Sequence, residues 1–176
     1  MTIDCVGVIG GGAWGTALAQ TMALAGHDVR LWAYEPDTIR EINEHHLNRV
    51  FLPGVTLEPR VKATGKLADA ATADVVLLVP PAQHLRRIAG ELSEYLPEGR
   101  AVVVCAKGIE KATGKLMGEV VHEALPQALL AVLSGPSFAA DVARGLPAAV
   151  TLASEDEATG RALAEGLGYR NLRIYW

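Results

Sequence analysis

The sequence predicts a doubly wound α/β fold, in which a mostly parallel sheet carries helices on both of its faces. Three observations support this prediction. Apolar runs of strand length alternate with helix-length segments along all 176 residues. Several of the runs are almost continuous in Val, Leu and Ala, as is typical of parallel strands that are buried on both faces. Glycines follow the first run at the spacing G-x-G-x-x-G, and such alternation forms right-handed crossovers within one domain.

The start of the chain contains the unit that indicates both the fold and a ligand. Residues 4–9 form a short apolar run rich in Val and Ile, and Gly10, Gly12 and Gly15 follow it directly. Each glycine has a separate task in a dinucleotide site. Gly10 permits a tight turn, Gly12 lets the backbone approach a diphosphate, and Gly15 lets the following helix pack closely on the strand.

A helix and a second strand complete this unit. Apolar residues recur at helical spacing beyond the turn, Gly26 ends the helix, and residues 28–32 form the next strand. Glu35 lies twenty residues after Gly15, where a carboxylate can accept a hydrogen bond from a ribose hydroxyl. The free N–H groups and the positive dipole end of the helix would face the diphosphate. We therefore predict a Rossmann-type domain rather than a glycine turn with a purely structural role.

The rest of the chain continues the alternation of strand and helix. Further strands are expected at 60–64, 74–79, 101–106, 128–133, 148–153 and 170–176. Further helices are expected at 36–47, 67–73, 82–95, 112–125, 140–144 and 155–167. The helical periodicity of the apolar residues predicts that Tyr95 and Leu116 face the interior. Residues 48–59, which include the sequence FLPG, break all periodicity, so they form either a loop near the adenosine side of the site or an ordinary surface connection.

Candidate site residues follow from the rule that ligands collect outside the carboxyl ends of parallel strands, where the strand order reverses. Besides the glycine turn, this rule selects Glu35, 79–81, Lys107 with Gly108, and 135–139. Lys107 is a single ammonium after six nearly uncharged residues, so it can attract a phosphate or a substrate oxygen. The alternative for Lys107 is a solvated lysine at the end of a strand.

Other chemistry-bearing residues give weaker signals. The S-G-P-S sequence at 134–137 offers N–H groups and hydroxyls that suit an anion or a carboxamide, but it is equally consistent with a simple turn. None of the five histidines clearly falls at the carboxyl end of a strand, and His84 comes closest. The chain lacks the G-x-S-x-G nucleophile elbow, so the sequence does not favour a hydrolase.

Composition narrows the range of partners. The chain has 16 Lys and Arg against 20 Asp and Glu, a formal net charge of −4, and no basic cluster, which argues against nucleic acid and anionic membranes. No apolar run is long enough to span a bilayer and no signal peptide is evident, so we expect a cytoplasmic protein. Cys5 and Cys105 each fall in a predicted buried strand and are interpreted as reduced core thiols. No Cys or His spacing predicts a metal site.

Several motifs together resemble the bacterial NAD(P)-dependent sn-glycerol-3-phosphate dehydrogenase family. The resemblance covers essentially the whole chain in the family's order, and its most specific parts are the Trp14-containing glycine turn and the GPSFA sequence. The motifs are GGGAWGTALA at 10–19, FLPG at 51–54, VPPAQHLR at 79–86, AKGIE at 106–110 and SGPSFAADVARGLPAAVTLAS at 134–154.

The resemblance implies reversible reduction of dihydroxyacetone phosphate to sn-glycerol 3-phosphate, which supplies the glycerol backbone of phospholipids. Hydride would pass from the nicotinamide to the carbonyl carbon, and Lys107 would hold and polarise the substrate. With the strand-end residues above, the candidate cofactor contacts are Gly10, Gly12, Ala13, Trp14, Gly15, Tyr34, Glu35, Phe51, Lys107 and Ala139. The candidate substrate contacts are Lys107, Gly135 and Ser137.

The family pattern departs from this chain in one segment. In the family, the proton-transferring lysine belongs to a G-G-x-x-K-N segment that precedes a helical substrate domain. This chain ends at Trp176, and no stretch within it matches that segment. We therefore expect residues 1–176 to be one dinucleotide-binding domain that contains no catalytic residue of its own and binds cofactor without turnover.

Cofactor preference depends on the end of the second strand. Family members that favour NADPH tend to have arginine at the positions of Tyr34 or Glu35, and the next arginine along this chain is Arg40. A carboxylate repels a 2′-phosphate, so NAD is favoured over NADP. Two alternatives remain open: another two-domain dehydrogenase acting on a 3-hydroxy acid or a sugar acid, and a non-catalytic module that senses nicotinamide redox state. Association into a homodimer is also left open.

Overall fold

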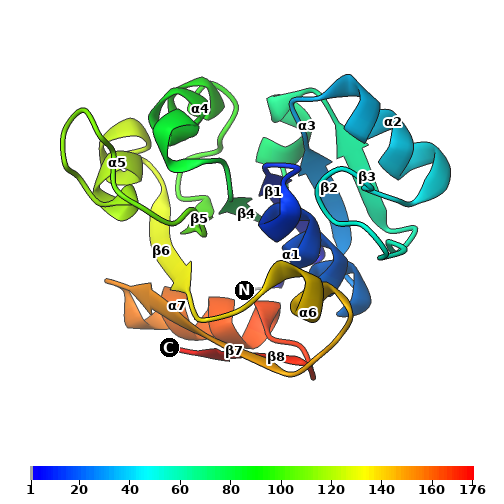
Figure 1. Ribbon diagram of the computed structural model, residues 1–176. Helices are drawn as coiled ribbons and strands as arrows, with labels where there is room; N and C mark the ends of the chain where they lie inside the picture. Colours follow the sequence, from blue (N-terminus) through cyan, green and yellow to red (C-terminus); the bar gives the residue numbers. More distant parts are fainter. Residues whose placement is uncertain (1) are drawn as a thin grey trace.

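The computed structural model describes residues 2–176 as one eight-stranded sheet with helices on both sides (Figure 1). The strand order is β3-β2-β1-β4-β5-β6-β7-β8. The strands are β1 (Cys5–Ile9), β2 (Asp28–Trp32), β3 (Val61–Thr64), β4 (Val75–Leu78), β5 (Ala101–Val104), β6 (Leu129–Ser134), β7 (Ala148–Ser154) and β8 (Leu172–Tyr175). The predicted doubly wound α/β fold is therefore confirmed.

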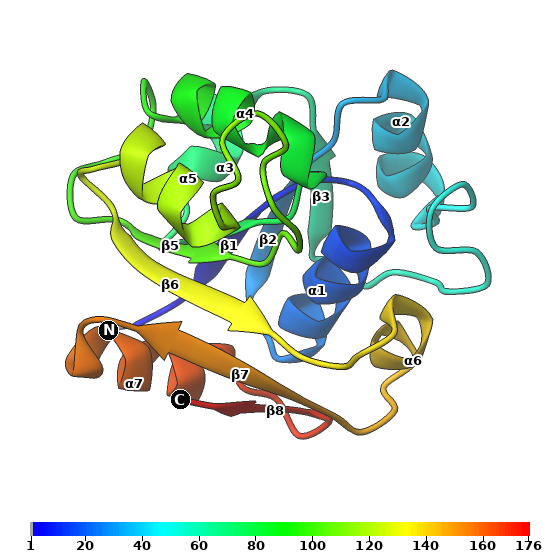
Figure 2. The ribbon, with the colours of Figure 1, turned by 60° about the vertical axis from the view of Figure 1, so that its left-hand side comes forward.

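The helices are divided between the two faces of the sheet, as Figure 2 shows. They are α1 (Ala13–Leu24), α2 (Pro36–His45), α3 (Leu67–Ala71), α4 (Leu85–Leu92), α5 (Met117–Ala124), α6 (Ala139–Ala143) and α7 (Glu157–Leu167), with a short 3₁₀ helix, η1 (Ala82–His84), before α4. Helices α3, α4 and α5 cover one face, and α1, α6 and α7 cover the other. Because β1 lies between β2 and β4, the strand order reverses beside β1, at the position where a doubly wound fold binds its ligands.

One connection in the sheet differs from the predicted succession of parallel crossovers. Strand β7 runs antiparallel to β6, with Leu133 opposite Leu152, whereas every other neighbouring pair from β3 to β8 is parallel. The physical reason is the short connection after β6. The only helix within it, α6, has five residues and packs against α1 beside the sheet, so it makes no crossover to a parallel neighbour.

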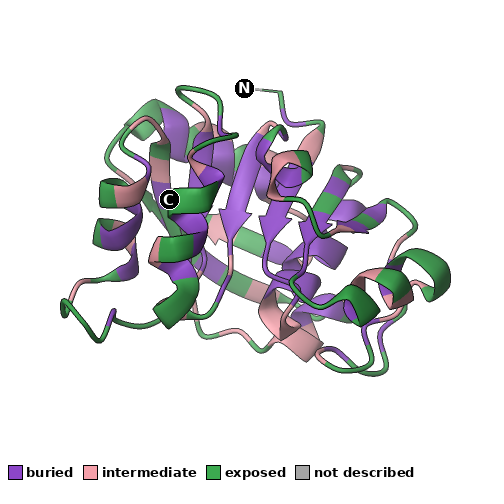
Figure 3. Ribbon diagram, turned by 90° about the horizontal axis from the view of Figure 1, so that it is seen from above, coloured by how far each residue is buried: buried purple, intermediate pink, exposed green. Residues whose placement is uncertain are grey.

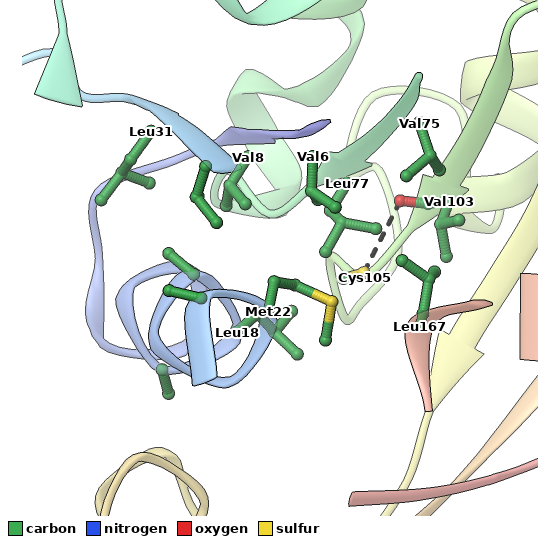
Figure 4. Close-up of a cluster of buried hydrophobic side chains, with 14 of the residues drawn as sticks. Val6, Val8, Leu18, Met22, Leu31, Val75, Leu77, Val103, Cys105 and Leu167 are labelled. Atoms are coloured by element: carbon green, nitrogen blue, oxygen red, sulfur yellow. Dashed lines mark hydrogen bonds between the residues drawn. The ribbon is translucent and has the colours of Figure 1, made fainter. Parts of the chain in front are cut away.

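The core explains why the central strands consist almost entirely of apolar residues. Strands β1, β4 and β5 are buried on both faces, and the exposed surface of the chain follows the outer sides of the helices and the loops (Figure 3). In Figure 4, Leu18 and Met22 of α1 face Val8 of β1 and Leu77 of β4. These four side chains are at most 1% exposed, so each contributes most of its transfer free energy to folding.

The two cysteines differ from one another. Cys105 is 1% exposed, and burial raises the pKa of its thiol well above the ordinary value, so it is an inert core thiol as predicted. Cys5 is a free thiol as predicted, but it is only half-buried, so the prediction that it lies in the core is wrong. Its position at the first residue of β1, near the edge of the core, accounts for the difference.

Two predicted helices are shorter than the periodicity suggested. The helix expected at 112–125 begins only at Met117, because Gly114 adopts a φ of +72° and the preceding residues close a turn in which Glu110 N–H donates to the carbonyl of Lys115 at 2.9 Å. Leu116, predicted to face inward, is 59% exposed at the end of this turn. The helix expected at 82–95 ends at Leu92, which leaves Tyr95 47% exposed instead of on the inner stripe.

Candidate functional site

A cleft of about 950 Å³ opens at the carboxyl ends of β1, β2, β4 and β5. It lies where the strand order reverses, as the fold predicts. Among the residues that line it are nearly all of the sequence-derived candidates: Gly10, Gly12, Ala13, Trp14, Gly15, Tyr34, Glu35, Phe51, Lys107, Ser137 and Ala139. The structure thus brings together segments that are more than 120 residues apart along the chain, from Gly10 to Ala139.

Two of the three motif glycines, Gly10 and Gly15, are required by the folded chain itself. Gly10 has a φ of +129°, and a Cβ added there would lie 2.9 Å from the carbonyl oxygen of Val79. A Cβ added at Gly15 would lie 1.9 Å from the carbonyl oxygen of Gly10, far inside van der Waals contact. The turn between β1 and α1 therefore closes only with glycine at both positions.

Gly12 differs, because nothing in the chain requires a glycine there. Its φ of −69° and ψ of −178° are open to any residue, and an added Cβ would meet no atom within 4 Å. The space in front of Gly12 belongs to the cleft, so the missing side chain leaves room for ligand atoms close to the backbone.

The start of α1 presents unpaired backbone donors at the same place. From Gly12 onward, the first N–H with a backbone acceptor is that of Thr16, which donates to the carbonyl of Gly12 at 2.9 Å. The four preceding N–H groups, from Gly12 to Gly15, correspond to the free donors at the start of any α-helix. No side chain caps α1 and no acidic residue occurs in its first turn, so its positive dipole end faces the cleft uncompensated.

Tyr34 and Glu35 form the wall of the cleft beyond β2. Tyr34 is 75% exposed, and Glu35 is the exposed residue that precedes α2 without capping any of its N–H groups. Arg40 of α2 donates to the Asp37 carboxylate at 2.8 Å. The end of β2 therefore carries an unpaired carboxylate, while Arg40 is paired with Asp37.

Lys107 follows the end of β5, and its side chain contacts two other segments that border the cleft. Its ammonium donates a hydrogen bond to the carbonyl of Gly135 at 2.9 Å and lies 5.8 Å from the centroid of the Trp14 ring. The Nε1 of Trp14 is buried without a hydrogen-bond partner. The exposed ammonium is thus held between the glycine turn and the loop after β6, where it can attract a negatively charged ligand.

Gly135 is the one residue among the expected cofactor and substrate contacts that does not line the cleft. An added Cβ would meet the carbonyl oxygen of Ala149 and the side chain of Val150, each at 2.9 Å, so Gly135 faces β7. It touches the site only through its carbonyl, which accepts the hydrogen bond from Lys107. The substrate contact expected at Gly135 stays a prediction, and Ser137 and Ala139 in the same loop line the cleft.

A network of ion pairs fixes the loop that carries Lys107. Arg86 of α4 donates two hydrogen bonds to the Glu110 carboxylate, at 2.8 and 2.9 Å, and also pairs with Glu123 of α5 at 2.9 Å. Lys115 pairs with Glu123, and Thr113 donates to Glu110 at 2.6 Å. The hydrogen bonds from Arg86 and Thr113 lower the pKa of Glu110 to about 2, so this carboxylate stays charged and holds the loop against both helices.

Comparisons with known proteins agree with this geometry. Residues 5–160 match the family model described as "NAD-dependent glycerol-3-phosphate dehydrogenase N-terminus". The chain belongs to this family. It is 56% identical to the glycerol-3-phosphate dehydrogenase [NAD(P)+] of Caulobacter vibrioides over 99% of its length, and 53% identical to that of Parvibaculum lavamentivorans over 97% of its length.

A solved structure gives the same assignment. The crystal structure of glycerol-3-phosphate dehydrogenase from Coxiella burnetii superimposes with a TM-score of 0.91, at 33% sequence identity, over 98% of this chain and 53% of that one. The chain spans about half the length of the curated relatives it matches, 53% of the Caulobacter protein and 51% of the Parvibaculum protein.

Sequence reasoning missed several cleft residues. Trp32 was expected only as a strand residue, and Arg87 and Ile88 only as parts of an amphipathic helix, yet all three line the cleft. Periodicity identifies the buried side of a helix but not the end that borders a ligand site, so no signal marked them. His84, the histidine that came closest to a strand end, also lines the cleft.

Two further observations concern metal ions and membranes. Within residues 2–176, no three His, Cys, Asp or Glu side chains are arranged to hold a metal ion. Over the same residues, every helix falls short of the length and apolar character that a membrane span requires.

Proposed function

We propose that this chain binds NAD(H) in the cleft and forms the nucleotide-binding half of an enzyme that interconverts dihydroxyacetone phosphate and sn-glycerol 3-phosphate. The observation that carries the proposal is Gly12. Neither its backbone angles nor its neighbours require a glycine, and it stands before the free N–H groups of α1. A diphosphate needs close approach to a helix N-terminus, and a side chain at position 12 would block it. The names of the relatives support the substrate.

Each part of the cleft has a distinct role in this proposal. The N–H groups of Gly12 to Gly15 bind the diphosphate, and Glu35 accepts a hydrogen bond from the adenosine ribose. Trp14, Phe51 and Ala139 form apolar walls beside the cofactor. When bound, the nicotinamide supplies the hydride for reduction of the substrate carbonyl.

Lys107 and Ser137 bind on the substrate side. The ammonium of Lys107 holds the substrate and polarises its oxygen, which stabilises negative charge as it develops there. The hydrogen bond to the carbonyl of Gly135 keeps this ammonium in position before the substrate arrives. The proton itself comes from the lysine of the family's G-G-x-x-K-N segment, which these residues do not contain, so residues 1–176 bind cofactor as one domain and do not turn over. The complete enzyme works in the cytoplasm and supplies phospholipid synthesis.

The proposal includes a preference for NAD over NADP. Glu35 carries an unpaired carboxylate where a 2′-phosphate would bind, and Arg40 is engaged by Asp37. Dissociation constants for NADH and NADPH, measured by calorimetry on the 176-residue chain, test this directly. We expect tighter NADH binding by the wild type, and a shift toward NADPH of at least about tenfold in Glu35→Arg, because one repulsion is replaced by a charge-assisted hydrogen bond.

Glu44→Arg is the matched control, since it makes the same charge change on the exposed side of α2. It should leave the ratio of the two dissociation constants unchanged. Tighter binding of NADPH by the wild type would refute the preference. Measurable reduction of dihydroxyacetone phosphate by the 176-residue chain alone would refute the absence of turnover.

A further inference from the structure

Asn48 is a buried polar residue at the start of the irregular segment that precedes β3. Its residue exposure is 1%, and its side chain uses both ends of the amide. The Nδ2 donates to the carbonyl of Gly11 at 2.9 Å and to the hydroxyl of Thr16 at 2.8 Å. The Oδ1 accepts from the N–H of Phe51 at 3.2 Å. One side chain therefore joins the glycine turn, the first turn of α1 and the loop that lines the cleft.

These contacts determine how the peptide between Gly11 and Gly12 is oriented. The Gly11 carbonyl accepts from Asn48 and also from the hydroxyl of Thr16, at 3.2 Å, so it is held in the protein interior. In a trans peptide the C=O and the following N–H point in opposite directions, and no cis peptide occurs in residues 2–176. The N–H of Gly12 is consequently turned away from Asn48, toward the cleft that Gly12 lines.

This orientation matters because glycine peptides rotate easily. Glycine populates positive and negative φ about equally, so three consecutive glycines, Gly10 to Gly12, offer little resistance to a peptide flip. A flipped peptide would present the Gly11 carbonyl to the cleft in place of the Gly12 N–H. An anion would then meet an acceptor dipole instead of a donor, and binding would weaken.

The same side chain anchors the opposite wall. The side chain accepts from the Phe51 N–H, and the main-chain carbonyl of Asn48 accepts from the Leu52 N–H at 2.8 Å, which closes the turn that presents Phe51 to the cleft. Farther along, Gln20 of α1 accepts from the N–H of Glu58 at 2.7 Å, so the segment is bound to α1 at both ends. The distance between the glycine turn and Phe51 is thereby fixed.

We propose that Asn48 is a positioning residue for the dinucleotide: it locks the Gly11–Gly12 peptide with its N–H toward the diphosphate. The inference rests on the proposed function of the cleft. Asn48 acts through the backbone of its neighbours and does not itself contact the ligand. Its effect is therefore specific for ligands that carry a diphosphate.

The test compares NADH with adenosine, which lacks the diphosphate, on the 176-residue chain. In Asn48→Leu, which removes the amide without adding charge, the dissociation constant for NADH should rise by about tenfold, as for one lost hydrogen bond to a charged group. The dissociation constant for adenosine should change by less than about twofold. Thr16→Val removes the hydroxyl that accepts from Asn48 and donates to the Gly11 carbonyl. It should weaken the binding of NADH but not of adenosine, and it replaces Asn48→Leu in the test if that variant does not fold.

The control is Asn43→Leu. Asn43 makes two comparable hydrogen bonds, to the carbonyl and N–H of Ala63 at 2.9 Å each, but lies away from the cleft. It should lose thermal stability without losing NADH affinity. The inference would be overturned, without affecting the proposed function, if Asn48→Leu and Thr16→Val weakened the binding of NADH and of adenosine equally. It would also be overturned if Asn43→Leu lost as much NADH affinity as Asn48→Leu. Absence of NADH binding by the wild type would overturn the proposed function as well.

Discussion

Gly12 and Gly15 are two glycines of one turn, and the structure predicts opposite consequences for replacing them with alanine. At Gly12 the added Cβ meets no atom within 4 Å, and the backbone angles suit alanine. Alanine would stabilise the fold by about 0.4–1 kcal/mol, because it lowers the conformational entropy of the unfolded chain. It would destabilise the fold by a similar amount, because alanine is a poorer N-cap residue than glycine. The free energy of unfolding of Gly12→Ala should therefore stay within about 0.5 kcal/mol of the wild type.

At Gly15 the added Cβ would lie 1.9 Å from the carbonyl oxygen of Gly10, a backbone atom that cannot move without separating α1 from β1. Overpacking of a tight core contact costs typically 1–3 kcal/mol, and this overlap lies at or beyond the upper end of that range. A loss of about 3 kcal/mol lowers Tm by roughly 6–12 °C in a domain of this size.

The assay pairs urea or thermal unfolding with an NADH titration for each variant. Gly12→Ala should keep the stability of the wild type and lose at least about tenfold in NADH affinity, because its methyl group fills the room left for the diphosphate. Gly15→Ala should lose stability first. The reasoning would be refuted by Gly12→Ala binding NADH as tightly as the wild type, or by equal destabilisation of both variants.

Two further predictions concern charged groups of the loop after β5. In the presence of NAD, Lys107→Met should weaken the binding of sn-glycerol 3-phosphate to the chain by about tenfold, as expected for the loss of a charge-assisted hydrogen bond. Lys62→Met, on the exposed side of β3, is the control and should leave this binding unchanged. Calorimetry measures both. The pKa of Glu110 is lowered to about 2 by its hydrogen bonds from Arg86 and Thr113, against an ordinary value of 4.5. Because the folded-state pKa is the lower one, this contribution to stability is complete above about pH 4.5 and is lost as the pH falls toward 2. Urea unfolding at pH 6 and pH 3 should show that loss, and a loss in Arg86→Met as large as in the wild type would contradict the assignment.

The sequence predicted the elements whose signals are local. Strand β2 occupies residues 28–32 as expected, because a glycine turn precedes it and an apolar run defines it. The cleft residues at strand ends followed from the rule for parallel sheets, since the position of a strand's carboxyl end depends only on where its apolar run stops. Their roles in binding remain predictions.

Features that depend on distant partners could not be predicted. Asn48 stands in a segment without periodicity, and its partners Gly11 and Thr16 lie more than thirty residues earlier. The antiparallel pairing of β7 depends on how α6 packs against α1, and the alternation of strand and helix in the sequence does not predict that packing. The late start of α5 follows from one left-handed residue, Gly114, within an otherwise helical pattern.

The central claim is that a dinucleotide diphosphate binds the free N–H groups at the start of α1. Amide chemical shifts of the 15N-labelled 18.6 kDa chain, recorded with and without NADH, test it most directly. The account predicts the largest shift changes at Gly12, Ala13 and Trp14, accompanied by changes at Glu35 and Lys107. Saturable NADH binding that leaves the amides of Gly12 to Trp14 unshifted would contradict it.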